Sequence, residues 1–319
     1  MSTAIDFEHV TKKYGATTAL DGVSFAIRTG EMFGLIGPDG AGKTTAIRAS
    51  CGLVGVEGGR VAVLGKDPVR EHRAITGAIG YLSQRFSLYG DLTIDENIAF
   101  FAEIHGVGRY GPARDRLLAM TQLTPFRARR ADRLSGGMKQ KLALACTLVH
   151  EPRVLLLDEP TTGVDPVSRR EFWKLLAEFL AGGLTIVMAT PYLDEAERCS
   201  RVALLHDGRL LAVDTPGALR RGLGGQVVEV VTDTARPPID VLAALPGVHD
   251  VQTFGERAHV RVEASGEQAA AAIRRGLEQH GIRVVAARPM MASLEDVFID
   301  LIAPAAGERP ATAPERVQG

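Results

Sequence analysis

The segment that most constrains the fold is a glycine-rich stretch between an apolar run and a helical pattern. Met32–Ile36 is a short apolar run, and residues 37–45 that follow it read GPDGAGKTT. This stretch matches the spacing G-x-x-x-x-G-K-[ST] in the strand-to-helix context that the pattern requires. Glycines let backbone N–H groups curl around phosphates, and the N-terminus of the following helix adds a positive dipole end. The stretch therefore predicts a nucleotide phosphate site at the end of a buried strand.

Side chains in the same stretch are suited to phosphate and metal chemistry. Lys43 would reach the β- and γ-phosphates as a point charge, which also makes it a candidate catalytic residue, and the Thr44 hydroxyl is suited to Mg²⁺. The predicted nucleotide-binding residues of this stretch are Gly37, Asp39, Gly40, Ala41, Gly42, Lys43, Thr44 and Thr45.

Further along the chain, the apolar pattern is that of a parallel sheet. Val154–Leu157 and Leu184–Ala189 are continuous apolar runs, as expected for strands buried on both faces. Between them, Glu171–Leu180 has apolar residues at helical spacing and ends at two glycines. Strand, helix and strand in this order form a βαβ unit, so the sequence predicts an α/β fold.

Two acidic residues, Asp158 and Glu159, directly follow the first of these runs. Nucleotide sites of open α/β sheets lie at the carboxyl ends of the strands, which is where this acidic pair would be placed. Asp158 is expected beside Mg²⁺, and Glu159 is placed to polarise an attacking water as a general base.

The rest of the chain divides into segments of different character. Residues 91–150 look mostly helical, with a capping box at Thr93 and Glu96, and residues 202–213 predict a hairpin around an Asp-Gly turn. After a glycine-rich boundary at 221–225, residues 226–302 repeat strands and helices on a smaller scale, which predicts a four-stranded α+β sandwich. Residues 303–319 are rich in alanine and proline, and we expect them to be disordered.

Composition excludes several classes of protein. The 319 residues include 37 Lys and Arg against 38 Asp and Glu, so the near-zero net charge argues against non-specific nucleic-acid binding. The N-terminus has no signal-peptide core, and no apolar run approaches the ~18 residues that span a bilayer. Three widely spaced cysteines fit reduced, buried thiols rather than disulfides, and the eight histidines form no zinc motif.

A further motif identifies the family that the chain resembles. Leu134–Lys141 reads LSGGMKQK and stands just before the strand that ends at Asp158. Together with the glycine-rich stretch, it resembles the signature of ATP-binding-cassette (ABC) ATPases. The resemblance covers residues 1 to about 220. It implies a P-loop NTPase cassette with a RecA-like core, an antiparallel β subdomain and a helical subdomain at about 91–150.

The resemblance also implies roles for single residues. Ser135, Gly136 and Gly137 would bind the γ-phosphate of ATP held by the opposing cassette, with Ser135 capping the helix that follows. Tyr14 would stack on adenine, and Gln84 would be a Mg²⁺ ligand and a catalytic-site residue that senses the membrane partner. The predicted metal ligands are therefore Thr44, Gln84 and Asp158, and the predicted catalytic residues are Glu159, Lys43 and Gln84.

Two positions depart from the family pattern. Asp39 stands where Asn is frequent, and its carboxylate can face away from the phosphates. Pro191 occupies the place of the switch histidine, which contacts the γ-phosphate and helps to order the water. Proline has neither a side-chain donor nor a backbone N–H, so this role passes to no residue here. We therefore predict slow ATP hydrolysis.

The C-terminal part resembles the appendage of drug-exporter ATPases of the daunorubicin-resistance type, chiefly in residues 293–301, SLEDVFIDL. The domains expected are a cassette at 1–222, an accessory domain at 226–302 and the tail. The resemblance implies a cytoplasmic ATP-binding subunit that docks at the inner face of the membrane on a separately encoded transmembrane permease and pairs with a second cassette. The alternatives are a soluble ABC ATPase acting on ribosomes or nucleic acid, and a catalytically degenerate subunit. The cargo and the identity of both partners stay open.

Overall fold

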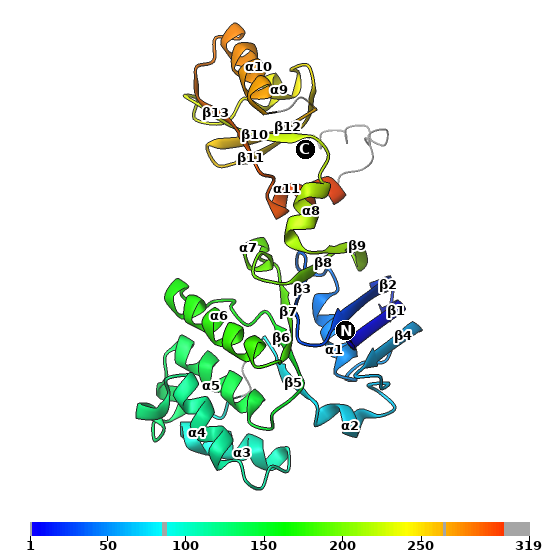
Figure 1. The fold of residues 1–319 in the computed structure, drawn as a ribbon, viewed down its shortest axis with the longest axis vertical. Coiled ribbons are helices and arrows are strands. Elements are labelled where there is room, and N and C mark those ends of the chain that lie inside the picture. The colour runs from blue at the N-terminus through cyan, green and yellow to red at the C-terminus, as the bar shows by residue number, and fades with distance from the viewer. Residues whose placement is uncertain (1, 85–87, 264–265, 303–319) are drawn as a thin grey trace, which may run out of the picture. The chain divides into compact units, whose positions relative to one another are not determined.

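The computed structural model describes residues 2–84, 88–263 and 266–302. The chain forms two compact units, Met1–Pro216 and Gly217–Gly319, and each is described by itself below (Figure 1). The predicted disordered tail at 303–319 lies outside the described residues. Within the described ranges, no helix combines the length and the apolar composition that crossing a bilayer requires.

The centre of the first unit is a six-stranded sheet in the order β5-β6-β7-β3-β8-β9, parallel except for β9 at its edge. Every residue of β3, β6 and β7 is buried, as the continuous apolar runs predict. The strands are β3 (Met32–Ile36), β5 (Ile79–Leu82), β6 (Val154–Asp158), β7 (Thr185–Thr190), β8 (Arg201–His206) and β9 (Arg209–Asp214).

A second, antiparallel sheet belongs to the same unit, in the order β2-β1-β4. Its core is continuous with that of the six-stranded sheet, because Phe25 stacks on Phe7 at 4.5 Å and on Phe33 of β3 at 5.6 Å between ring centroids. The first two strands of this sheet are 12 residues long each. The strands of this sheet are β1 (Thr3–Tyr14), β2 (Thr17–Arg28) and β4 (Gly58–Val63).

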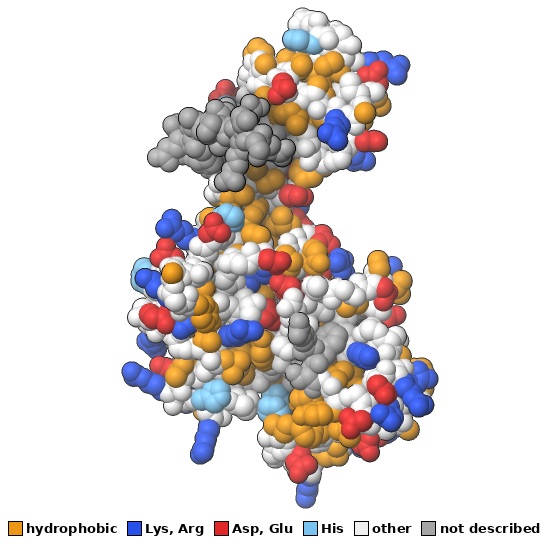
Figure 2. All heavy atoms as spheres, turned by 180° about the vertical axis from the view of Figure 1, so that it is seen from behind, with side chains coloured by type: hydrophobic (Ala, Val, Ile, Leu, Met, Phe, Trp, Pro, Cys, Tyr) orange, Lys and Arg blue, Asp and Glu red, His pale blue; other side chains and the backbone are white. Residues whose placement is uncertain are grey.

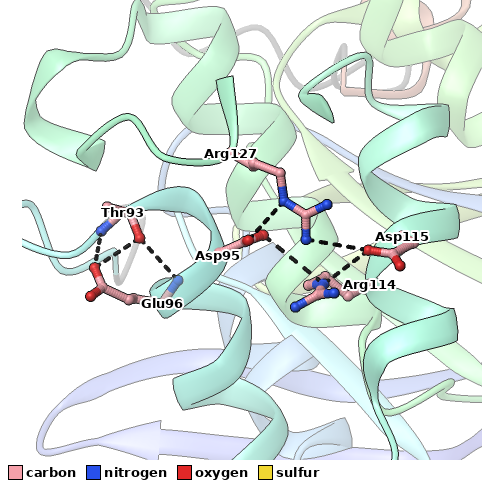
Figure 3. Close-up of polar contacts among 6 residues, drawn as sticks. All are labelled: Thr93, Asp95, Glu96, Arg114, Asp115 and Arg127. Atoms are coloured by element: carbon pink, nitrogen blue, oxygen red, sulfur yellow. Dashed lines mark hydrogen bonds and ion pairs between the residues drawn. The ribbon is translucent and has the colours of Figure 1, made fainter. Parts of the chain in front are cut away.

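The helical part of this unit lies beside β5, where Figure 1 shows α3, α4 and α5 grouped together. The predicted capping box is confirmed, because the Glu96 N–H donates to Thr93 Oγ1 and the Thr93 N–H donates to Glu96 Oε2 (Figure 3). Arg127 ties the start of α3 to α4 by contacts of 2.8 Å to Asp95 and 3.4 Å to Asp115. The elements are α3 (Ile94–Ile104), α4 (Gly111–Met120), two 3₁₀ turns (Thr124–Phe126 and Ala131–Arg133) and α5 (Gly136–Leu148).

Most of the remaining helices of the unit follow strands of the six-stranded sheet, and one, His72–Thr76, follows β4 of the antiparallel sheet. The longest of them begins five residues before the predicted start at Glu171, because the Asp165 carboxylate accepts hydrogen bonds from two N–H groups of its first turn and Pro166 is its first residue. The turn at Asp207 and Gly208 has positive φ at both residues, as predicted. These helices are α1 (Lys43–Ser50), α2 (His72–Thr76), α6 (Pro166–Ala181) and α7 (Leu193–Ala196), and α8 (Pro216–Gly222) leads into the second unit.

The second unit is an antiparallel four-stranded sheet in the order β11-β12-β10-β13, with α9 and α10 on one face. Apolar side chains of β10 and β12, such as Val228 and Val260, form the core with Leu242, Ile273 and Leu277 from these helices. The elements are β10 (Gln226–Thr232), α9 (Ile239–Ala243), β11 (Val248–Phe254), β12 (Arg257–Val262), α10 (Gly266–Gln279), β13 (Val284–Met290) and α11 (Leu294–Ile302).

All three cysteines are free and buried, as predicted. Burial raises the pKa of each thiol, to about 12 for both Cys51 and Cys199.

Candidate nucleotide-binding site

The glycine-rich stretch connects β3 to α1 and is shaped by close approaches. A Cβ on Gly37 would lie 2.1 Å from the carbonyl oxygen of Leu205, and one on Gly42 would lie 2.4 Å from that of Ala19. Gly42 also has a φ of 100°, which other residues rarely adopt. Ala41 is buried, and Thr45 is half-buried in the first turn of α1. The close approaches at Gly37 and Gly42 and the positive φ of Gly42 therefore require glycine at both positions of the loop that leads into the helix.

Lys43 is buried at the start of α1, with 3% of its side chain exposed. Its Nζ donates to the carbonyl oxygens of Gly37 at 2.7 Å and Pro38 at 2.8 Å, and lies 3.7 Å from Glu159 Oε1. Burial lowers the pKa of Lys43, although the Glu159 and Asp39 carboxylates oppose the shift. The Asp39 side chain is 93% exposed and 4.0 Å from Nζ, so it points to solvent.

The Thr44 hydroxyl donates to Asp158 Oδ1 at 2.9 Å, which joins α1 to the end of β6. Asp158 is 2% exposed, and its other oxygen accepts a longer bond of 3.4 Å from the Tyr81 hydroxyl. Burial raises the pKa of Asp158, because the hydrogen bonds from Thr44 and Tyr81 offset only part of the desolvation. Hydroxyl and carboxylate oxygens are the ligands that Mg²⁺ prefers, so this pair fits such an ion.

Glu159 follows Asp158 in a left-handed conformation, with a φ of 49°. Its N–H donates to the carbonyl oxygen of Ala189 on β7 at 2.9 Å, and Gln84 donates to its Oε2 at 3.0 Å. The structure thus brings together Lys43, Thr44, Gln84, Asp158 and Glu159, which come from three separate segments of the sequence. A positive φ at a residue other than glycine is a strained conformation that clusters at functional sites.

The predicted signature residues lie at the start of α5. Ser135 caps this helix, and its hydroxyl oxygen accepts a hydrogen bond from the Met138 N–H at 3.3 Å. Gly136 is exposed, but a Cβ on Gly137 would lie 2.2 Å from the Ser168 hydroxyl oxygen on α6. Gly137 therefore has a packing reason to be glycine that is independent of any ligand.

Tyr14 and Pro191, the two other positions singled out in the sequence, lie at the ends of strands. Tyr14 is 46% exposed at the end of β1, with Lys12 Nζ 5.2 Å from its ring centroid. Pro191 directly follows β7, and the next N–H, that of Tyr192, donates to Thr190 Oγ1 at 3.1 Å.

Sequence reasoning missed a buried polar group beside this site. Glu195 on α7 is 1% exposed and accepts a hydrogen bond from the Thr161 hydroxyl at 2.6 Å, and Arg169 lies 3.6 Å from the same oxygen. Nothing in the local sequence distinguishes Glu195 from its exposed neighbours Asp194 and Glu197. Only the packing of α7 shows which of the three is buried.

Comparison with known proteins assigns both units. Residues 20–162 match the family model for ABC transporter, and residues 215–302 match that of the C-terminal domain of DrrA1-3-like ATP-binding proteins. The daunorubicin resistance ATP-binding protein DrrA2 of Streptomyces coeruleorubidus is 37% identical over 304 residues, which is 93% of this chain and 94% of DrrA2. The chain therefore belongs to the ATP-binding proteins of ABC transporters, of the type with a DrrA-like C-terminal domain.

Two further similarities refine this assignment. The probable multidrug ABC transporter ATP-binding protein YbhF of Escherichia coli K12 is 42% identical over 86% of this chain, but the chain spans only 48% of the length of YbhF. A solved structure of an ATP-binding subunit of an ABC transporter superimposes with a TM-score of 0.63 at 30% identity, covering 69% of this chain and 92% of the other.

Proposed function

We propose that this chain is the ATP-binding and ATP-hydrolysing subunit of an export-type ABC transporter. The observation that carries the proposal is the meeting of Lys43, Thr44, Asp158 and Glu159 at the end of the parallel strands. The sequence of the second unit supports the export type, because it matches the DrrA1-3-like C-terminal domain.

The residues of this site divide the chemistry among them. The N–H groups of the glycine-rich loop and Lys43 bind the phosphates, and Tyr14 provides a flat exposed ring for adenine. Thr44 and Asp158, with Gln84, would hold Mg²⁺, which neutralises phosphate charge when bound. Glu159 orients and deprotonates the attacking water, and its bond from Gln84 and its fixed backbone conformation aim the carboxylate.

The signature residues act on a second cassette. Ser135 aims the N-terminus of α5 outward, and Gly136 is exposed beside it, so this helix end is open to a nucleotide held by a partner cassette. Two cassettes would close on two ATP molecules, and closure would drive a separately encoded transmembrane permease. The chain would then sit at the cytoplasmic face of the membrane through that permease, which would determine the cargo.

The glycine-rich loop can be tested with one substitution. Lys43→Ala removes a charge-assisted phosphate contact of about 1.5–3 kcal/mol, so ATP affinity measured by calorimetry should fall at least about tenfold. Lys174→Ala, an exposed lysine on α6, is the matched control and should bind ATP as the wild type does. Equal ATP affinity in the Lys43 variant and the control would refute the assignment of this loop.

A catalytically degenerate subunit is the second candidate, and Pro191 favours it. Loss of one preorganised donor to the transition state typically costs ~10²–10³ in rate, so the wild type should bind ATP normally but hydrolyse it slowly. Pro191→His should raise turnover, and the ATP affinity of the variant checks that the loop has not refolded. Brisk wild-type turnover that the substitution leaves unchanged would exclude this candidate.

A soluble ATPase acting on nucleic acid finds less support. Figure 2 shows Lys and Arg side chains intermingled with Asp and Glu over the face that it presents, rather than gathered into one basic patch. Copurification of the chain from membranes with a permease would separate the two functions.

The proposed domains are a cassette at 1–222, with its helical part at about 91–150, and an accessory domain at 226–302. Each unit has its own apolar core, so a 1–225 fragment should fold and bind ATP. We expect the fragment to lose dimer stability or assembly with the permease instead. An insoluble fragment, or one that fails to bind ATP, would contradict this boundary.

A further inference from the structure

The buried carboxylate of Glu195 has no part in the site as described so far. It lies on α7, in the segment that follows β7, and its Oε1 accepts a hydrogen bond of 2.6 Å from the Thr161 hydroxyl. Both side chains are 1% exposed. An ionised carboxylate is costly to bury, so a site that keeps one must supply partners for it.

Arg169 on α6 is the cation that faces Glu195. Its Nε lies 3.6 Å from Glu195 Oε1, its Nη1 donates to Asp194 at 3.4 Å, and its guanidinium lies 5.1 Å from the ring centroid of Tyr192. Arg169 Nε and Glu195 Oε2 are both buried without a hydrogen-bond partner in the described part of the chain. The network thus joins the segment after β7 to the segment after β6, with one donor and one acceptor still unused.

The segment after β6 carries Glu159. Thr161 stands two residues beyond it, and the same loop is held on another side by Gln140 of α5, whose Nε2 donates to the carbonyl oxygen of Pro160 at 2.5 Å. A third contact is the hydrogen bond that the Glu159 N–H donates to the carbonyl oxygen of Ala189 on β7. These three contacts hold the backbone on both sides of Glu159 and so fix the direction of its side chain. Of the three, the bond between Thr161 and Glu195 joins two side chains.

We propose that Glu195, acting through Thr161 and Arg169, is a positioning residue for ATP hydrolysis. Its buried carboxylate holds the loop after β6 so that the Glu159 side chain keeps its direction toward the attacking water. Because Pro191 has no donor to offer, the segment after β7 contributes to the reaction through this buried contact instead. The inference rests on the proposed ATPase function, because positioning matters only if Glu159 acts on water.

The experiment compares threonine variants of the full-length chain. Thr161→Val keeps the shape of the side chain and removes the hydroxyl, whereas Thr161→Ser keeps the hydroxyl. Thr121→Val is the matched control, because Thr121 is also fully buried but its hydroxyl donates to carbonyl oxygens of the adjoining helix α4, far from the loop after β6 in the sequence. For each variant, ATP affinity is measured by calorimetry and the hydrolysis rate by single turnover of radiolabelled ATP.

A misplaced catalytic group costs rate rather than ground-state binding. Thr161→Val should therefore hydrolyse ATP about tenfold or more slowly with its ATP affinity unchanged within about twofold. Thr161→Ser should recover the wild-type rate within about threefold, and Thr121→Val should keep it. A purely structural role would reduce affinity, rate and thermal stability together.

Glu195→Gln is the second variant, in case Thr161→Val does not fold. It keeps an acceptor for Thr161 but loses the charge that faces Arg169, so we expect a loss of about threefold or more in rate at unchanged affinity. A wild-type rate in both Thr161→Val and Glu195→Gln, or a rate lost only in proportion to ATP affinity, would overturn the inference. A wild type that does not bind ATP would instead refute the proposed function.

Discussion

Buried ionisable groups of the two units have pKa values shifted in opposite senses, toward the neutral form in the cassette and toward the charged form in the second unit. In the cassette, burial shifts the pKa of Lys43 down and that of Asp158 up, so both groups are pushed toward their neutral forms. In the second unit, burial alone would raise the pKa values of Glu229 and Asp296, but their hydrogen bonds outweigh it and hold both below the usual range. Glu229 is paired with Arg257 and Arg288, at 2.9 and 2.8 Å.

This difference separates a site that needs a ligand from one that is complete. The buried charges of the second unit are satisfied by the protein itself, which is what a structural network requires. Those of the cassette are incompletely compensated, and a phosphate beside Lys43 or a cation beside Asp158 would supply what is missing. Lys43 and Asp158, shifted toward their neutral forms, lie at the candidate nucleotide site, whereas Glu229 and Asp296, shifted toward their charged forms, belong to networks that are already complete.

The largest effect is expected at Glu159, the proposed general base of the cassette. Glu159→Gln keeps the shape of the site but loses the base, so the variant should accumulate an ATP-bound dimer of cassettes. Ser135→Arg added to it should abolish that dimer by bulk and charge at the start of α5, whereas Ser200→Arg at an exposed position should not. Sedimentation at saturating ATP and Mg²⁺, with any required partner cassette present, provides the measurement. A monomeric Glu159→Gln variant under these conditions would mean that the closed pair does not form.

Removing the charge of Glu229, which is fully paired, should lower the stability of the second unit. Glu229→Gln removes the anion between Arg257 and Arg288, and we expect a loss of about 1–3 kcal/mol, limited because both arginines can turn to solvent. The melting of the second unit, followed by calorimetry on the full chain, measures the loss. Glu278→Gln, at an exposed position of α10, is the control. If both variants melt alike, the network of Glu229 is not structural.

Neutralising Asp158, whose charge is only partly compensated, should raise the stability of the cassette instead of lowering it. The folded-state pKa of Asp158 is raised, so ionising it works against folding at neutral pH, and Asp158→Asn should stabilise the nucleotide-free cassette by about 1 kcal/mol. For a unit of this size that is a rise of about 2–4 °C in melting temperature. The same variant should weaken Mg²⁺-dependent nucleotide binding. A lower melting temperature than that of the control Asp91→Asn would show that Asp158 is already compensated.

The smallest effect concerns acid stability. The folded-state pKa of Asp296 is lowered, so its hydrogen bonds from His259 and Ser293 stabilise the second unit above the ordinary carboxyl pKa and are lost as the pH falls below about 4. Asp296→Asn should be less stable than the wild type at pH 7 but should lose less on acidification. Parallel acid-unfolding curves for Asp296→Asn and the exposed control Asp240→Asn would contradict this account.

Contacts between sequence neighbours, and those that follow from parallel strands ending at one edge, were predictable, whereas other contacts between distant residues were not. The glycine-rich loop, the capping box at Thr93 and the turn at Asp207 each follow from residues a few positions apart. Placing Asp158 near Thr44 needed only the rule that parallel strands end at one edge. By contrast, the bond from Gln140 to Pro160 joins residues 20 positions apart, and that from Arg288 to Glu229 joins residues 59 apart.

The left-handed backbone at Glu159 illustrates the same limit. Glutamate has no intrinsic preference for positive φ, so the sequence offered no signal for it. The conformation is imposed by the hydrogen bond to Ala189 and by the anchored residues that follow, which are tertiary features. The sequence therefore identifies which residues could act, and packing decides how they are aimed.

The burial of all three cysteines has a practical consequence for following this cassette in solution. With a pKa of about 12, the Cys51 and Cys199 thiols are ionised to only roughly one part in 10⁵ at neutral pH, and Cys146 is shifted further in the same direction. Maleimide reagents and mild oxidants react with the thiolate, so the native chain is nearly inert to them. A single cysteine introduced on an exposed face can then carry a fluorescent or spin label without removal of the native thiols, and label-to-label distances would report how two cassettes approach.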